Sequence, residues 1–440
     1  MLPAFGGLVW TVIAFVVALS IIVAVHEYGH YIVGRWSGIH ADVFSLGFGP
    51  VVYSRIDKRG TRWQLAALPF GGFVKFAGDA DAASGKDGAK MSTLSGTELR
   101  RTMHGAPLWA RAATVAAGPI FNFILSIVVF MGLFLAYGVA SKLPVIGSMK
   151  PLPYDAQSLL PGDQILSVAG LDTPDFDTFF DATKDLPITK TVDYRVQRAG
   201  GALVVTGPYP FPPVADGVQP RSAASAAGIK SGDVILAIDG KPVSAFEQVR
   251  TAVGASDGKA MVFKVWRDGA AFDATMTPQR RDLPKDGGGF ETRWLIGMSG
   301  GLMFVPELHT PGLFEATSLA GQRTWDAGTT NLSFLWNIVI GNVSTCNVSG
   351  PIGIAKVSGD AARQGLDSFI MLIALLSTSV GLLNLFPIPV LDGGHLVFHA
   401  FEAVTGKPPS DRVLRVLMGI GLTALLGLMA FALTNDIFCP

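Results

Sequence analysis

The chain has 440 residues, of which 49% are hydrophobic and only 15% charged, and its mean hydropathy is +0.42. Soluble domains carry about 25% charged residues, so this composition predicts an integral membrane protein with soluble portions. The 34 basic residues equal the 34 acidic ones, which argues against a nucleic-acid partner. Cys346 and Cys439 are too few for a disulfide framework. Unpaired thiols are expected, and one bridge between the two cysteines is the alternative.

Charge-free apolar stretches long enough to cross a hydrocarbon core of about 30 Å occur at four places in the chain. With their adjoining motifs they predict membrane helices at 6–34, 112–140, 368–392 and 413–435. No basic residue precedes Arg35, so the first helix lacks the positive region of a cleavable signal peptide and is expected to stay.

The distribution of basic residues predicts the orientation in the membrane. Segment 41–111 is rich in Lys and Arg, so the positive-inside rule places it in the cytosol. Both termini and the long region 142–367 are then extracytoplasmic. An uncharged stretch at 327–355 is interrupted by Asn, Ser, Gly and Pro, which favours an interfacial amphipathic element. As a fifth span, the alternative, it would reverse the last two helices.

The first predicted helix ends in the polar motif VHEYGHYI, residues 25–32. His26 and His30 are four residues apart, so one helix face presents two imidazoles that can bind a single Zn²⁺. Zinc acidifies a bound water, and Glu27 can take its proton as general base during attack on a peptide carbonyl. Ionisable groups at membrane depth are costly without partners, which favours a metal site over an exposed polar face.

A third zinc ligand is expected in NLFPIPVLDGGH, residues 384–395. Asp392 follows Pro387 and Pro389, which interrupt the third predicted helix and free backbone groups that only protein or a wet cavity can accommodate. The first and third helices run in the same direction, so both motifs are expected at similar depth near the cytosolic face.

Two other interpretations of this region stay open. Asp392 could simply cap the following helix. His395 and His399, again four residues apart, are a rival ligand pair. The histidines at 40, 104 and 309 have no comparable neighbours in the sequence.

These motifs resemble the site-2 protease family of intramembrane zinc metalloproteases, over nearly the whole chain. The similar stretches are HEYGH, FSLGFGP (44–50), ALPFGGFVKFAGD (67–79), AAGPIFNF (116–123), SGPIGIAKVSG (349–359) and NLFPIPVLDGGH. The resemblance implies that Asp392 is the third zinc ligand beside His26 and His30. It also implies that TRWQLAALPFGGFVKF forms a β-hairpin-like element that dips into the membrane beside the zinc.

Substrate contacts are expected around this element and the second motif. Gly71 and Gly72 suit a turn, and a strand edge there could hold an unwound substrate by main-chain hydrogen bonds. Asn122 and Asn384 are candidate partners for the substrate backbone or for the extended chain, with interhelical hydrogen bonds as the alternative for each. The expected substrate-binding residues are Gly71, Gly72, Asn122, Asn384, Pro387 and Pro389.

The extracytoplasmic region contains an internal repeat. The stretch LPGDQILSVAGLDTPDFDTF begins at 160, and KSGDVILAIDGKPVSAFEQV begins 70 residues later, at 230. The pattern predicts two β-rich modules, 143–212 and 213–283, that resemble PDZ domains. A steric filter above the active site is slightly preferred over peptide binding by strand addition. Residues 284–366 are expected to be a linker and an interfacial amphipathic segment.

The expected fold is therefore an α-helical polytopic membrane protein with four transmembrane helices, a membrane-dipping β element and two extracytoplasmic PDZ-like domains. The expected activity is that of an intramembrane zinc endopeptidase of the bacterial inner membrane, which cuts single-span membrane proteins after a first cleavage. The resemblance implies an anti-sigma factor among the substrates, and remnant signal peptides as further ones. Membrane lipid is the other expected partner, and no oligomeric state is predicted. The alternative is a membrane-tethered PDZ receptor with a structural or inactive metal site.

Overall fold

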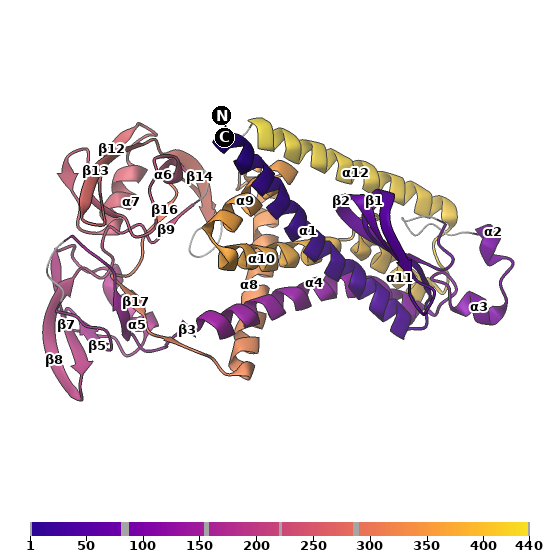
Figure 1. Ribbon diagram of the computed structural model, residues 1–440, viewed down its shortest axis with the longest axis horizontal. Helices are drawn as coiled ribbons and strands as arrows, with labels where there is room; N and C mark the ends of the chain where they lie inside the picture. Colours follow the sequence, from indigo (N-terminus) through magenta and orange to yellow (C-terminus); the bar gives the residue numbers. More distant parts are fainter. Residues whose placement is uncertain (1, 81–87, 154–157, 220–221, 285–289, 439–440) are drawn as a thin grey trace. The chain divides into compact units, whose positions relative to one another are not determined.

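The computed structural model describes residues 2–80, 88–153, 158–219, 222–284 and 290–438 (Figure 1). The chain forms two compact units. The helical unit comprises Met1–Leu133, Gly312–Ile338 and Thr345–Pro440, and the β-rich unit comprises Phe134–Pro311 and Val339–Ser344.

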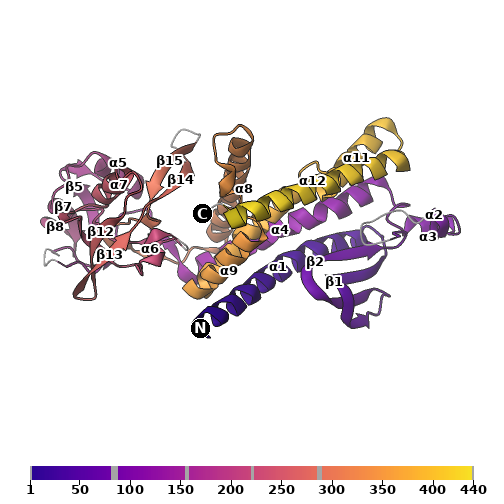
Figure 2. The same ribbon diagram turned by 90° about the horizontal axis from the view of Figure 1, so that it is seen from above.

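Among the described residues, four helices of the helical unit are long and apolar enough to cross a membrane. They are α1 (Leu2–Trp36), α4 (Leu108–Tyr137), α10 (Leu366–Asn384) and α12 (Asp411–Phe438). Figure 2 shows the axes of α1, α4 and α12 inclined at similar angles, with the chain running in opposite directions along α1 and α12. The four spans expected from the sequence are therefore confirmed as helices.

The third span is shorter than expected. Helix α10 ends at Asn384, and residues 385–391 run irregularly before α11 (Asp392–Thr405) begins. Pro387 and Pro389 lie in this irregular stretch, where proline cannot supply the amide hydrogen that a continuing helix needs. The LDGG motif thus opens a separate helix instead of closing the third span.

Several further helices accompany the spans. They are α2 (Gly88–Met91), α3 (Gly96–Arg100), α8 (Leu313–Val339), η1 (Thr345–Asn347) and α9 (Pro351–Gln364). On α8 the buried side chains Ala316, Ala320 and Thr324 recur every four residues, and Asn331 donates a hydrogen bond to Ser379 of α10. Helix α8 is not among the candidate spans of the described chain. Small side chains on one face let it pack closely against its neighbours.

Two long strands, β1 (Ala41–Ile56) and β2 (Arg62–Phe76), pack beside α1. Phe44 of β1 lies opposite both Val74 and Trp63, so the first part of β1 is paired on both sides by β2. Gly71 has a φ of +112°, a conformation open to glycine, and lies where β2 passes from one side of β1 to the other. The interruption expected at this glycine pair is present inside the paired region.

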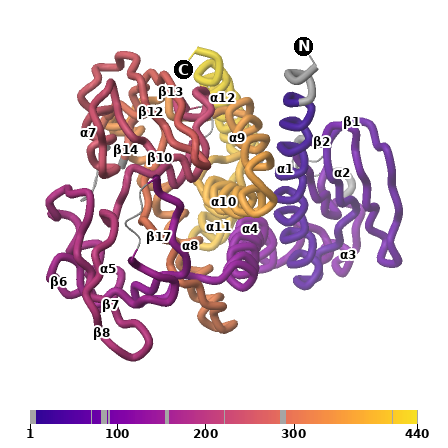
Figure 3. The backbone as a smooth tube through the Cα atoms, turned by 60° about the vertical axis from the view of Figure 1, so that its left-hand side comes forward, coloured from indigo at the N-terminus to yellow at the C-terminus, as the bar shows by residue number. Residues whose placement is uncertain are grey.

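The β-rich unit contains, in its described part, two four-stranded sheets of the same strand order, β6-β5-β7-β8 and β11-β10-β12-β13 (Figure 3). In the first module these are β5 (Gln164–Val168), β6 (Leu171–Asp172), β7 (Thr191–Arg198) and β8 (Gly201–Pro208), with helix α5 (Phe176–Lys184). In the second they are β10 (Val234–Ile238), β11 (Lys241–Pro242), β12 (Met261–Arg267) and β13 (Ala270–Met276), with helices α6 (Ala223–Ala226) and α7 (Phe246–Gly254). The repeat in the sequence is a repeat in the fold.

The expected boundary of the second module at residue 283 is wrong, because the chain beyond it returns to both modules. Strand β14 (Gln279–Pro284) pairs with β15 (Phe290–Leu295). The returning strands pair with earlier ones: β16 (Met298–Ser299) with β9 (Gly217–Val218), β17 (Phe304–Pro306) with β4 (Ile146–Met149), and β18 (Leu308–His309) with β3 (Val139–Ala140). Ile296 and Phe304 are buried in the two module cores, so this segment is no linker.

The expectation of unpaired cysteines is also wrong for Cys346, which is disulfide-bonded. The alternative expected from the sequence is a bridge between Cys346 and Cys439, and Cys439 lies outside the described residues. The Asn435 side chain donates to the carbonyl of Thr345, so the end of α12 is held beside η1 where Cys346 lies.

Each module is closed by the same buried ion pair. Arg198 Nε donates to Asp163 at 2.6 Å, and Arg267 Nε donates to Asp233 at 2.6 Å. Both aspartate side chains are only 1% exposed. Burial would raise the pKa of Asp163, but the hydrogen bonds from Arg198 and from the Leu160 amide hold it below its usual range. This pair therefore stabilises the module while Asp163 is ionised.

We expect Asp163→Ala to destabilise the first module by about 1–3 kcal/mol, because the partly exposed Arg198 guanidinium and the Leu160 amide lose their charged acceptor. Hydrogen exchange of residues 164–208 in the full-length protein measures the effect. Asp172→Ala removes an exposed pair with Arg195 and is the matched control, expected to change little. Equal exchange in both variants would contradict this account.

A pKa that folding lowers also makes the stability of the first module depend on pH. The stabilising contribution of Asp163 is present above about pH 4 and is lost as the pH falls below that value.

Candidate metal centre

Three side chains from distant parts of the chain converge on one point of the helical unit. His26 and His30 project from α1, and Asp392 lies in the first turn of α11. The Nε2 atoms of His26 and His30 lie 3.2 Å and 3.5 Å from Asp392 Oδ2, and 3.2 Å from one another. Among the described residues, these three side chains form a group whose ligand atoms are close enough together to hold one metal ion. The structure thus brings together the residues that the two sequence motifs supplied.

The spacing of these atoms fits a tetrahedral zinc ion. Ligand atoms about 2.0–2.1 Å from zinc at tetrahedral angles are roughly 3.3 Å apart, close to the observed separations. Asp392 Oδ2 is buried and accepts no hydrogen bond, which is costly for a carboxylate that has no cation beside it. The donor set of two imidazoles and one carboxylate leaves a fourth position for water.

Each imidazole is oriented by a second contact. His30 Nδ1 lies 2.8 Å from the carbonyl oxygen of Thr114, which can only accept, so Nδ1 carries the proton and the Nε2 lone pair faces Asp392. The side-chain amide of Asn122, which is fully buried on α4, lies 3.1 Å from His26 Nδ1. For Asn122 this geometry favours the interhelical hydrogen bond over the direct substrate contact expected from the sequence.

Close helix packing at two glycines makes room for the histidines. A Cβ atom on Gly118 of α4 would lie 2.3 Å from His30 Nε2, and one on Gly29 of α1 would lie 2.6 Å from the carbonyl of Ala117. Both distances are far below van der Waals contact, so α1 and α4 can approach this closely only with glycine at these positions. Sequence reasoning gave Gly118 no role, although a Gly-Pro pair inside an apolar span was a visible signal.

The loop before α11 sets the position of Asp392. Ile388 donates to the Phe386 carbonyl and Leu391 to the Ile388 carbonyl, so the chain folds back tightly. A Cβ on Gly393 would lie 2.3 Å from the Leu385 carbonyl, so this loop needs glycine after the aspartate. Leu391, not Asp392, is the N-cap residue of α11. The capping interpretation of Asp392 is therefore not favoured.

A cavity of about 490 Å³ adjoins the three side chains. Glu27 and Asn384 line it, together with Gly72 of β2. A Cβ on Gly72 would lie 3.2 Å from Glu27 Cγ, so β2 passes directly beside this glutamate. Asn384 also donates to the Val380 carbonyl within its own helix. Glu27 and strand β2 therefore lie side by side in the wall of this cavity.

Three further histidines line the same cavity. His395 and His399 do so from α11 but lie outside the converging triad. Burial, with the nearby Arg111 charge, lowers the pKa of His399 to about 4, so its imidazole is neutral at pH 7. His104 was set aside at the sequence level, yet its Nε2 lies 3.1 Å from the buried carboxylate of Asp79. Asp79 precedes His104 by 25 residues, so no local sequence motif could have indicated this contact.

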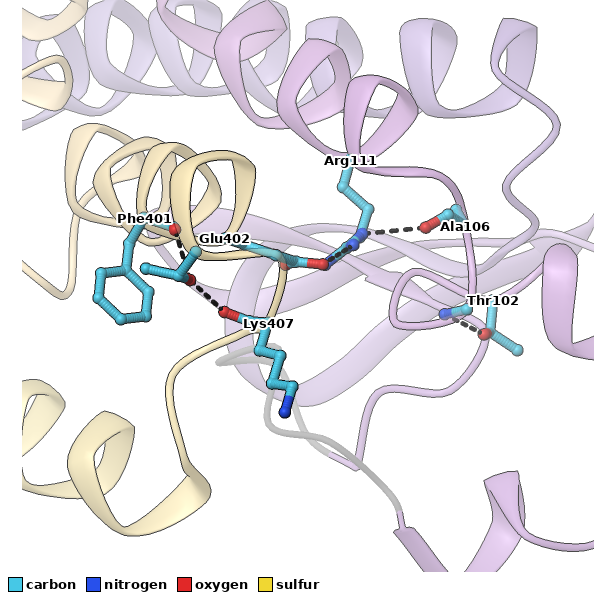
Figure 4. Close-up of polar contacts among 8 residues, drawn as sticks. Thr102, Ala106, Arg111, Phe401, Glu402 and Lys407 are labelled. Atoms are coloured by element: carbon cyan, nitrogen blue, oxygen red, sulfur yellow. Dashed lines mark hydrogen bonds and ion pairs between the residues drawn. The ribbon is translucent and has the colours of Figure 1, made fainter.

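A bidentate ion pair ties α11 to the start of α4. Figure 4 shows Arg111 and Glu402 pointing at one another, with Nη1···Oε2 at 2.9 Å and Nη2···Oε1 at 2.6 Å. Arg111 Nε also donates to the Ala106 carbonyl at 3.0 Å. Hydrogen bonds from Arg111 hold the pKa of Glu402 below its usual range. The pair anchors the helix that carries Asp392 to the helix that orients the two histidines.

The sequence is similar to that of known proteins over nearly its whole length. The profile of peptidase family M50 matches residues 14–428. A protein of Agrobacterium fabrum named as a zinc metalloprotease is 37% identical over 441 residues, which cover 99% of this chain and 98% of the relative. The regulator of sigma-E protease RseP of Salmonella typhimurium is 34% identical over 462 residues, which cover 98% of this chain and 99% of the relative.

We expect Gly118→Ala to lower zinc affinity by about 10- to 100-fold, because the added methyl group displaces His30 from its present position. Zinc content per chain, measured by elemental mass spectrometry after dialysis against a graded chelator series, reports the effect. Gly132→Ala is the matched control, since Gly132 lies in the same helix and a Cβ there has nothing within 4 Å. Normal zinc content in Gly118→Ala would contradict the packing argument.

Proposed function

We propose, on the premise that this chain belongs to peptidase family M50 and is a zinc metalloprotease of the site-2 type, that it cleaves single-span membrane proteins within or near the bilayer. The observation that carries the proposal is the meeting of His26, His30 and Asp392 beside Glu27 on a helix long and apolar enough to span a membrane. A soluble peptidase would have no need for that setting.

The residues divide the chemistry among them. His26, His30 and Asp392 would hold the zinc ion. When bound, zinc polarises the scissile carbonyl and makes water a stronger nucleophile near neutral pH. The Glu27 carboxylate takes a proton from the attacking water and passes it to the nitrogen of the leaving amine. Thr114 and Asn122 hold the imidazoles in the required orientation.

Substrate binding is proposed to occur along β2. A transmembrane helix hides its carbonyl groups in intrahelical hydrogen bonds, so the scissile segment has to unwind before attack. Strand addition at Gly71 and Gly72 would supply main-chain hydrogen bonds to the extended segment beside Glu27. Asn384, which lines the cavity, and the chain at Pro387 and Pro389 are proposed to contact the segment from the other side.

The proposed location is the bacterial inner membrane, with segment 41–111 in the cytosol and the β-rich unit and both termini in the periplasm. The Lys and Arg content of that segment supports this orientation. The named activity of the Salmonella relative supports an anti-sigma factor as substrate, cut after a first cleavage. The two repeated modules, which are proposed to be PDZ-like, suit a filter that admits only substrates already shortened outside the membrane.

Replacing Glu27 with Gln tests the catalytic role. The variant keeps the side-chain size but cannot accept a proton, so we expect normal zinc content and cleavage slowed by about 10²- to 10⁴-fold. Cleavage of a model single-span protein in proteoliposomes, with zinc content measured on the same sample, reports both. Unchanged cleavage would remove Glu27 as the base, whereas wild-type protein that binds zinc and cuts nothing would favour the receptor alternative.

Replacing Asp392 with Ala tests the ligand set. We expect zinc affinity to fall by more than the roughly 10- to 100-fold typical of losing an outer hydrogen-bond partner. His395→Gln and His399→Gln are the controls, because both residues line the same cavity from the same helix as Asp392. Retained zinc in Asp392→Ala together with lost zinc in the two histidine variants would transfer the ligand role to the rival pair.

A further inference from the structure

A second cavity of the helical unit has no part in the proposed proteolysis. It encloses about 400 Å³ at the point where α1 ends and the chain turns into β1. Arg35, His40, Arg59 and Arg101 line it, and we name it the arginine pocket. Three separate stretches of the chain thus contribute one arginine each, and His40 belongs to the same stretch as Arg35.

The pocket lining is strongly positive. Among its described lining residues there are three arginines and no carboxylate. Asp57 lies close by, but its oxygens accept from the Arg59 and Thr61 amides at 2.8 Å and 3.1 Å and from the Trp63 indole at 3.2 Å. Asp42 also lies beside the pocket, with Oδ1 3.6 Å from His40 Nε2. These two carboxylates are fewer than the three arginines, so the pocket keeps an excess of positive charge. An anion that enters the pocket meets more than one guanidinium, and guanidinium groups bind phosphate in a bidentate fashion.

The surroundings of the pocket indicate the membrane–water interface. Trp36, next to Arg35 at the end of α1, has 74% of its surface exposed. Val52 and Tyr53, which lie farther along β1 and outside the pocket lining, are 69% and 63% exposed. Tryptophan and tyrosine concentrate where hydrocarbon gives way to headgroups, so these apolar side chains would lie beside lipid acyl chains while the arginines face the headgroup layer.

We propose that the arginine pocket binds the phosphate of an anionic phospholipid headgroup in the cytosolic leaflet. The proposal depends on the proposed orientation of segment 41–111, but not on proteolysis. Basic pockets on the cytosolic side of membrane helices are suited to anionic headgroups, whose leaflet carries a negative surface potential. A soluble phosphate would gain the same ionic contacts but none of the acyl-chain contacts with Val52 and Tyr53.

Two lining residues of the pocket, Tyr31 and Arg35, belong to α1, the helix that also carries His26 and His30. Arg35 Nη1 donates to the Tyr31 hydroxyl at 2.8 Å, and Tyr31 is 4% exposed and adjacent to His30. A headgroup held by Arg35 would fix the depth of the end of α1 in the bilayer. The lipid would therefore position the histidine motif relative to the membrane in which the substrate lies.

Native mass spectrometry of the full-length protein, titrated with phosphatidylglycerol or phosphatidylcholine in detergent at 0.5 M salt, tests the proposal. High salt screens diffuse attraction to exposed charges, so binding that persists reports a pocket. We expect one tightly bound phosphatidylglycerol in wild type. Because each basic residue near a headgroup contributes about a fivefold change in affinity, Arg59→Gln/Arg101→Gln should weaken binding about 25-fold.

The matched control is Arg55→Gln/Arg62→Gln, which removes two exposed charges of the same β1–β2 element outside the pocket. It should bind phosphatidylglycerol as wild type does, and normal zinc content in both double variants shows that the fold is kept. If the first pair does not fold, Arg59→Gln alone should lower affinity about fivefold. Equal losses in pocket and control variants, or equal affinity for phosphatidylcholine, would overturn the proposal. Displacement of the lipid by millimolar inorganic phosphate would assign the pocket to a soluble anion instead.

Discussion

The close approach of α1 to α4 is the constraint on which the candidate metal centre depends. Gly29 and Gly118 remove the side-chain atoms that would hold the two helices apart, and His30 fills the space left above Gly118. The carbonyl of Thr114 on the same face of α4 then fixes the ring of His30. The Arg111–Glu402 pair brings α11 to the same place, so the acid that completes the site is set by contacts outside the site itself.

Much of the candidate site follows from local sequence, because its parts are encoded at helical spacing. His26 and His30 share a helix face by virtue of their separation alone, and an uncharged run of sufficient length predicts a span whatever its neighbours are. The presence of two repeated β-rich modules was predictable as well, since a repeat is found by comparing the sequence with itself. Each of these inferences concerns residues close together in the chain.

What sequence reasoning missed depends on contacts between distant residues. Arg111 and Glu402 are separated by 291 positions, and neither lies in a motif that names the other. The role of Gly118 depends on which helix packs against it, which hydropathy cannot show. The predicted end of the second module was wrong because β16 and β17 are short and pair with β9 and β4, which lie much earlier in the chain. The composition of this segment is typical of a loop, so its strands could not be predicted without knowing the distant strands with which they pair.

The pairing of β3 with β18 has a consequence for how such a chain could arise and be altered. Val139 lies opposite His309 and Ala140 opposite Leu308, so the backbone enters and leaves the β-rich unit through two adjacent, hydrogen-bonded segments. A unit whose ends meet in this way can be inserted into a loop or removed from it with little strain on the parent fold. The helical unit and the β-rich unit are therefore separable in design, and a different domain could be exchanged for the β-rich unit at the β3–β18 pair.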